Sequence, residues 1–96
     1  MTYAPKIVLK LPLSNPNLLE AFVEACLRDG VILIAIVGEG ASEIENLIDR
    51  LVVGDGTDRS RFITTSFHPN ETVEEVMEFA QSWEEERGHP VELVKL

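Results

Sequence analysis

The chain has 96 residues, a length that predicts one domain over residues 1–96. Its residues are 45% hydrophobic and 26% charged, which is the composition of a globular protein with a packed core. It contains 8 Lys and Arg residues and 17 Asp and Glu residues, which gives a formal net charge of −9. Because nucleic-acid binding draws its affinity from basic side chains that displace counterions from phosphates, this balance argues against a nucleic-acid partner.

The first third of the sequence predicts a strand followed by a helix. Alternating hydrophobic residues in KIVLKL indicate a strand over Lys6–Leu11. Asn15 is suited to cap a helix and Pro16 to be its first residue, and apolar residues then recur at helical spacing. We therefore predict a helix over 16–29, ended by Gly30.

A second strand and helix follow. The run VILIAIV, Val31–Val37, is continuous and β-branched, as is typical of a parallel strand covered on both faces. Ser42 and Glu45 have the spacing of a capping box, in which each side chain bonds the backbone N–H of the other residue. This pattern predicts a helix that starts at Ser42 and is ended by Gly54.

The last third repeats the strand–helix pattern. The aromatic and β-branched segment RFITTSF predicts a strand over Arg61–Phe67. Thr72 and Glu75 form a second potential capping box, so a helix is predicted from there to Gly88. Its apolar stripe includes Trp83, which we expect to be part of the core.

A final strand, predicted over Val91–Leu96, completes the order β-α-β-α-β-α-β. Short connections in this order predict a Rossmann-like, three-layer α/β/α open sheet of four mainly parallel strands. With strands numbered in chain order, two arrangements are open. Order 3-2-1-4 buries Val31–Val37, whereas order 2-1-3-4 places it at an edge, where its apolar surface would imply a dimer.

Localisation follows from the apolar runs and the cysteine count. The longest apolar run, Val31–Val37, is far shorter than the about 20 residues that cross a bilayer. The apolar N-terminus is interrupted by Lys10 and Pro12 and resembles no secretion signal. Cys26 is the only cysteine and falls on a buried stripe, so one chain forms no internal disulfide. We predict a cytoplasmic protein with no membrane partner.

Ligands of open α/β sheets bind beyond the carboxyl ends of the strands. The loops expected there carry the ligand-binding candidates Ser14, Glu39, Ser42, Ser66, His68 and Glu71. In GEGAS, glycines could let backbone N–H groups face an anion, but the third glycine of a dinucleotide motif and the lysine of a P-loop are missing. We expect a structural turn there and no cofactor.

Ser66, His68 and Glu71 are also the residue types of a hydrolase site. A nucleophile needs a base within hydrogen-bond distance and an oxyanion site, and the motif G-x-S-x-G is absent. We therefore favour a capped helix start and expect no catalytic residue. Two His and one Cys do not make up the usual ligands of zinc, so no metal site is expected.

Acidic residues dominate the expected carboxyl-end edge of the sheet: Glu20, Glu24, Glu39, Glu43, Glu45, Glu71, Glu74, Glu75 and Glu78, against Lys10 and Lys95. Acids in the first turn of a helix complement its dipole, which explains much of the pattern. A negative field of this extent also attracts basic protein surfaces. The partner-binding candidates are the acids at two helix starts: Glu39, Glu43, Glu71, Glu74 and Glu75.

We therefore expect a non-enzymatic protein-interaction or regulatory domain whose acidic edge binds a basic protein. The alternative is a small-molecule binding protein or enzyme with its site in the same loops. A homodimer paired through an edge strand is a third hypothesis. A pocket of about 300 Å³ or more with convergent polar groups would favour the small molecule, and an open convex face would favour the protein partner.

Overall fold

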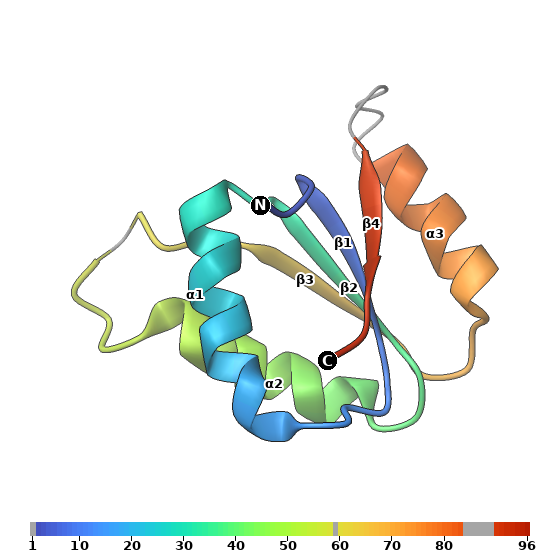
Figure 1. Cartoon of the computed structure of the whole chain (residues 1–96), viewed down its shortest axis with the longest axis horizontal. Coiled ribbons are helices and arrows are strands. Elements are labelled where there is room, and N and C mark those ends of the chain that lie inside the picture. Colours follow the sequence, from blue (N-terminus) through green and yellow to red (C-terminus); the bar gives the residue numbers. More distant parts are fainter. Residues whose placement is uncertain (1, 59, 84–89) are drawn as a thin grey trace.

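The computed structural model describes residues 2–58, 60–83 and 90–96, and its strands form one parallel sheet in the order β3-β2-β1-β4 (Figure 1). The elements are β1 (Lys6–Lys10), the short 3-10 helix η1 (Pro16–Leu18), α1 (Leu19–Asp29), β2 (Leu33–Val37), α2 (Ala41–Val53), β3 (Thr64–His68), α3 (Val73–Ser82) and β4 (Val91–Val94). The predicted α/β class is confirmed, and of the two strand orders the structure adopts 3-2-1-4. Across the described residues, no helix is both long and apolar enough to cross a membrane.

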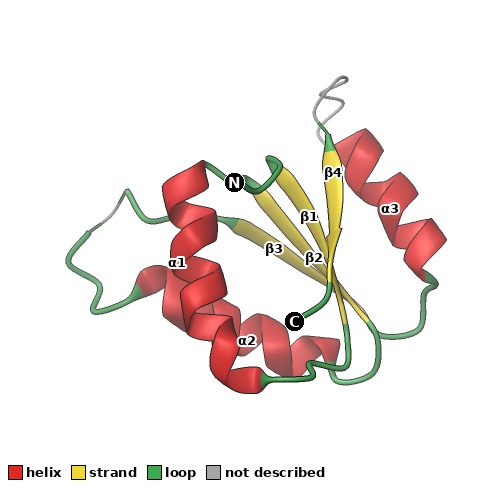
Figure 2. Ribbon diagram, in the orientation of Figure 1, coloured by secondary structure: helices red, strands yellow, loops and turns green. Residues whose placement is uncertain are grey.

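The helices form a layer on each face of the sheet (Figure 2). α1 and α2 cover one face and α3 covers the other, because the chain reverses its direction across the sheet after β3. β2 lies between β1 and β3, and all five of its residues are buried. The run VILIAIV is therefore covered on both sides, as its composition predicted, and the argument for a dimer through β2 no longer applies.

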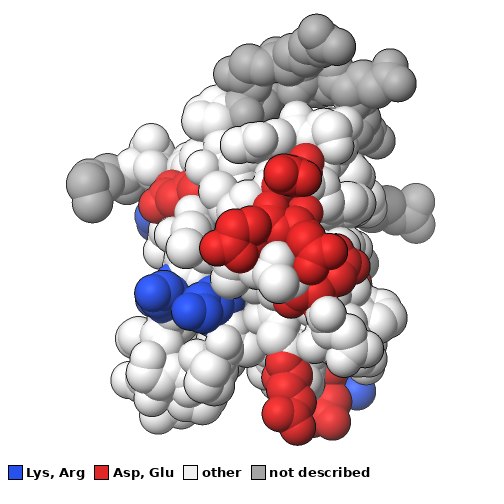
Figure 3. Space-filling model, turned by 90° about the vertical axis from the view of Figure 1, so that its right-hand side faces the viewer, with Lys and Arg blue, Asp and Glu red and all other residues white. Residues whose placement is uncertain are grey.

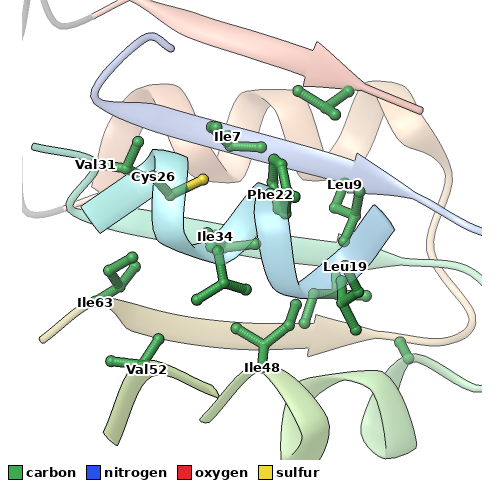
Figure 4. Close-up of a cluster of buried hydrophobic side chains, with 14 of the residues drawn as sticks. Ile7, Leu9, Leu19, Phe22, Cys26, Val31, Ile34, Ile48, Val52 and Ile63 are labelled. Carbon is green, nitrogen blue, oxygen red and sulfur yellow. The ribbon is translucent and has the colours of Figure 1, made fainter. Parts of the chain in front are cut away.

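The larger core lies between the sheet and the two helices α1 and α2. In Figure 4, Phe22 and Cys26 point from α1 toward Ile7 and Ile34 of the sheet. Cys26 is fully buried, as predicted. The smaller core joins α3 to the opposite face of the same strands and consists of Val8, Leu33, Ala35, Val37, Val76 and Ala80. Alternate strand residues thus serve opposite cores.

Lys6 is an exception to the apolar core, because it is fully buried on the α3 side. Its Nζ donates a hydrogen bond to the carbonyl oxygen of Trp83 at 3.1 Å and lies 5.9 Å from the centre of the Trp83 ring. Trp83 directly follows α3, and a cation is favourable at the C-terminus of a helix. Trp83 itself is half-buried against the smaller core, less deeply than predicted.

Two of the predicted helix starts are confirmed. The side chain of Asn15 accepts a hydrogen bond from the backbone N–H of Asn17, and the first turn of that helix is the 3-10 segment η1. At α3, Thr72 Oγ1 accepts from the N–H of Glu75 at 3.1 Å, and the Glu75 carboxylate accepts from the N–H of Thr72 at 2.9 Å. The capping box predicted from these two residues is therefore present.

The capping box predicted at Ser42 and Glu45 is wrong. α2 starts at Ala41, and the residue before it, Gly40, has a φ of 82° and no side chain to act as a cap. Gly38, with a φ of 125°, also has a left-handed backbone, and a Cβ built there would lie 3.0 Å from that of Leu11. The two glycines let the chain turn directly from β2 into the helix, so Ser42 is an exposed residue of its first turn.

Strand β3 starts at Thr64, three residues later than predicted, because Arg61 anchors the preceding loop. Its guanidinium donates to the carbonyl oxygens of Leu51 and Val52 at the end of α2, both at 2.8 Å. It also pairs with the Glu24 carboxylate of α1 at 2.6 Å. Residues 61–63 are thereby held against the two helices, and the chain first pairs with β2 at Thr64.

Two other predicted strand boundaries shift by two residues each. β2 starts at Leu33 instead of Val31, and β4 ends at Val94 instead of Leu96. α3 ends at Ser82, because Trp83 has a non-helical ψ of 128°. The rest of that predicted helix, up to Gly88, lies outside the described residues.

Candidate functional site at the carboxyl ends of the strands

The loops that follow β1, β2 and β3 are joined by backbone hydrogen bonds at one end of the sheet. The N–H of Leu11 donates to the carbonyl of Val37, and the N–H of Gly38 donates to the carbonyl of His68. The predicted site residues of these loops therefore lie along one edge, in the region where open α/β sheets bind ligands.

Ser14 forms hydrogen bonds within the chain, to Leu96. Its backbone N–H and its Oγ both donate to the carbonyl oxygen of Leu96 at 2.6 Å. This contact lies where the strand order reverses between β1 and β4, the usual ligand crevice of such sheets. Ser14 thus holds the segment after β4 in that crevice. Because this segment occupies the crevice, the candidate site lies instead beside the loops that follow β1 and β2.

Ser66, His68 and Glu71 form a hydrogen-bonded chain at the end of β3. Ser66 Oγ lies 2.9 Å from His68 Nε2, and His68 Nδ1 lies 3.0 Å from Glu71 Oε1. Ser66 and His68 are two residues apart in a strand and so share its α3 face. The imidazole also packs against the ring of Phe79 of α3, with 4.8 Å between ring centres.

This order of groups is the one that activates a serine nucleophile in hydrolases. Here it also satisfies both nitrogens of an imidazole that is only 8% exposed, as a buried polar group requires. Ser66 belongs to an extended strand, whereas a nucleophile elbow presents its serine on a sharp strand-to-helix turn. A structural role at the β3–α3 junction accounts for all three side chains.

A hollow of about 310 Å³ opens beside the β1 and β2 loops, between the N-terminal ends of η1, α1 and α2. It is lined by Leu11, Pro12, Leu13, Pro16, Leu19, Glu39, Gly40, Glu43, Ile44 and Leu47. Its walls are apolar except for the carboxylates of Glu39 and Glu43, both of which are exposed residues. An apolar group accompanied by a positive charge is the matching ligand chemistry.

A second hollow, of about 420 Å³, continues from the first along α1 and α2. The two share Pro16, Leu19 and Leu47, and the second adds Asn17, Glu20, Arg50 and Leu51. We refer to both together as the α1–α2 groove. Leu47 on its wall is 45% exposed, although it lies one residue before the fully buried Ile48 of α2. The groove is therefore an open apolar surface whose charged residues are three acids, Glu20, Glu39 and Glu43, and one base, Arg50.

The groove was missed by the sequence analysis. The one signal for it is the apolar tripeptide Leu11–Leu13, which stands in a loop that would ordinarily be polar. Leu11 is buried and Leu13 is half-buried against the larger core. The loop after β1 is thus built to extend the apolar surface of the core out to the groove.

The predicted partner-binding acids fall into two groups on opposite sides of the sheet. Glu39 and Glu43 border the α1–α2 groove. Glu71, Glu74 and Glu75 surround the start of α3, on the other face. Figure 3, which faces the side on which α3 lies, shows acidic side chains gathered there. Glu71 and Glu75 in that group already bond His68 and Thr72.

Glu24 differs from the other acids that we assigned to this edge. Its carboxylate forms a double contact with the Arg61 guanidinium, with 3.0 Å and 2.6 Å between the paired atoms. The hydrogen bond from Arg61 lowers the pKa of Glu24, and the same bond raises the pKa of Arg61. Glu24 therefore belongs to the anchor of the loop before β3 and not to the acidic edge.

Among the side chains that the structure describes, no three His, Cys, Asp or Glu residues come together in a way that could hold a metal ion. In the Ser66–His68–Glu71 chain, the polar atoms already bond one another.

The fold and the loops at its carboxyl-end edge define a small, parallel α/β domain. Residues 7–95 match the model of the family described as domain of unknown function DUF7684, and the chain belongs to that family. Neither a curated protein nor a solved structure matches the chain.

Proposed function

We propose that this domain is a non-catalytic interaction module that binds a short apolar segment of a partner protein in the α1–α2 groove. Lysine or arginine side chains beside that segment pair with Glu39 and Glu43. The observation that carries the proposal is the combination of an open apolar groove with carboxylates as the polar groups of its first hollow. Peptide recognition in apolar grooves between secondary-structure elements is a recurrent mode of protein interaction.

The charge of the chain supports a basic partner. Its net charge of −9 attracts cationic segments at long range and speeds their association. The apolar floor then supplies the binding free energy, because Leu13 and Leu47 lose contact with water when a partner side chain covers them. Glu71, Glu74 and Glu75 lie on the other face and are not part of this contact.

A small-molecule ligand is the second candidate. The first hollow, at about 310 Å³, is at the lower end of the volume of small-molecule pockets. Its few polar groups restrict such a ligand to an apolar amine. The length of the groove favours a peptide, since the second hollow of about 420 Å³ continues it along both helices.

The test uses a displayed library of random peptides selected on the wild-type protein. We expect the selected peptides to carry apolar residues flanked by Lys or Arg, and to shift the backbone NMR signals of Leu13 and Leu47. The double variant Glu39→Lys/Glu43→Lys should weaken their binding, measured by fluorescence anisotropy. Added salt should weaken wild-type binding in the same direction, because exposed charges are screened over about 8 Å at physiological ionic strength.

The matched control is Glu74→Lys/Glu78→Lys on α3, which changes the net charge equally on the opposite face. It should leave most of the affinity in place. If both double variants weaken binding equally, the peptides sense only the overall charge, and the groove proposal is wrong. If hexylamine gives the same shifts at Leu13 and Leu47 and displaces the peptides, the small-molecule alternative is favoured instead.

A further inference from the structure

The outer edge of β3 has unused hydrogen-bonding capacity. Thr64 donates its N–H to Ile32, and His68 accepts from the N–H of Gly38, so alternate residues of β3 bond toward β2. Thr65 and Phe67, between them, direct their N–H and C=O groups to the opposite side. In the described part of the chain no strand lies beyond β3, so these groups form an open sheet edge.

β3 and the three residues before it carry no carboxylate and expose two aromatic side chains. Phe67 is 48% exposed, and Phe62, just before the strand, is 74% exposed. From Arg61 to His68 the sequence RFITTSFH contains no acidic residue, in a chain of net charge −9. Two copies of so acidic a protein repel each other over most of their surfaces, and this segment itself adds no carboxylate to that repulsion. The other sheet edge, β4, carries Glu92.

We propose that two copies of the chain pair through β3 in an antiparallel arrangement and form one continuous sheet. A two-fold axis through Ser66 places Thr65 of each copy opposite Phe67 of the other. Both members of such a pair point their N–H and C=O groups outward, so each pair exchanges two backbone hydrogen bonds. Any antiparallel pair of identical strands can satisfy this two-fold symmetry.

A hollow near the same edge provides a site for the Phe67 side chain of the second copy. It measures about 310 Å³ and is lined by Asp49, Arg50, Val53 and Gly54 of α2 and its C-terminal end. Thr65 donates a hydrogen bond to Asp49 at 2.8 Å, so this hollow lies beside the position that Phe67 of the second copy would face. Val53 in its wall is 54% exposed. Pairing would therefore cover two exposed apolar side chains, Val53 of one copy and Phe67 of the other.

The experiment measures the mass of the protein in solution by sedimentation equilibrium over a range of concentrations. We expect wild type to change from the mass of one chain to twice that mass as the concentration rises. Phe67→Glu should remain a single chain throughout, because it places a carboxylate beside Asp49 of the other copy. Leu93→Glu adds the same charge at an exposed position of β4, the opposite edge of the sheet, and should dimerise like wild type.

A second variant separates pairing from folding. Thr65→Pro removes an N–H that points away from β2, a position at which an edge strand tolerates proline, and it should also abolish the dimer. Circular dichroism checks that each variant is folded. In wild type, the amides of Thr65 and Phe67 should exchange with solvent slowly in the dimer and rapidly on dilution. A wild type that stays monomeric at every concentration overturns the proposal. So does a dimer that persists in folded Phe67→Glu or Thr65→Pro, or one that Leu93→Glu abolishes as well.

Discussion

At the residue scale, Cys26 shows how burial controls reactivity. Burial raises the pKa of its thiol from 9.0 to about 12, and the thiolate is the reactive form. We expect a thiol reagent at pH 8 to label native protein only at the rate at which the chain unfolds, and to label urea-unfolded protein at once. Rapid labelling of the native protein would contradict the burial of this side of α1.

The same shift predicts a pH dependence of stability. Because the unfolded thiol ionises near pH 9.0 and the native thiol near 12, the stabilisation is complete below pH 9 and decreases as the pH rises between these values. From pH 8 to pH 10, wild type should lose about 1 kcal/mol more of its free energy of unfolding than Cys26→Ala. Urea titrations of both proteins at the two pH values measure the difference, and equal losses would contradict the prediction.

At the scale of the element, the starts of α2 and α3 differ although their sequences look alike. Thr72→Ala removes the cap of α3 and should lower the free energy of unfolding by about 1 kcal/mol. Ser42→Ala changes an exposed residue inside the first turn of α2, where alanine is the better helix former, and should change it by less than about 0.5 kcal/mol. Urea unfolding measures both changes. Equal losses in the free energy of unfolding would mean that Ser42 caps α2 after all.

Local patterns predicted the elements but not all of their ends. The two hydrogen bonds of the capping box join Thr72 to Glu75, so four consecutive residues of sequence contain the whole motif. Ser42 and Glu45 have the same spacing, yet the turn made by Gly38 and Gly40 starts the helix earlier. The spacing alone does not distinguish the two cases, because the deciding contact is the approach of Gly38 to the loop after β1.

Tertiary contacts set the boundaries and surfaces that the sequence analysis missed. β3 starts late because Arg61 bonds carbonyl groups at the end of α2, which are ten and nine residues before it. Leu47 follows the apolar stripe of α2 but lines an open groove, since exposure there depends on how α1 and α2 lie together. The burial of β2 was predictable because its own composition tolerates no solvent-exposed face.

At the scale of the whole molecule, β2 should be the most stable part of the sheet. It is bonded to strands on both sides and covered by helices on both faces. We expect the amides of Ile34, Ala35 and Ile36 to exchange with deuterium more slowly than those of β4, because their opening requires global unfolding. Exchange measured by NMR gives the order, and faster exchange in β2 than in β4 would contradict the strand order.

The pairing of β1 with β4 has a consequence for synthesis of the chain. Residues 6–9 pair with residues 91–94, and Ser14 holds Leu96. One neighbour of the interior strand β1 is therefore the last of the four strands of this sheet to leave the ribosome. The first three strands can associate while translation continues, but one side of β1 then stays unpaired until β4 emerges. Contacts between such distant residues form slowly, because a long loop must close first. During that interval the apolar strand β1, which is interior in the finished sheet, is an open edge, and this makes the nascent chain a substrate for chaperones or for premature association with its neighbours.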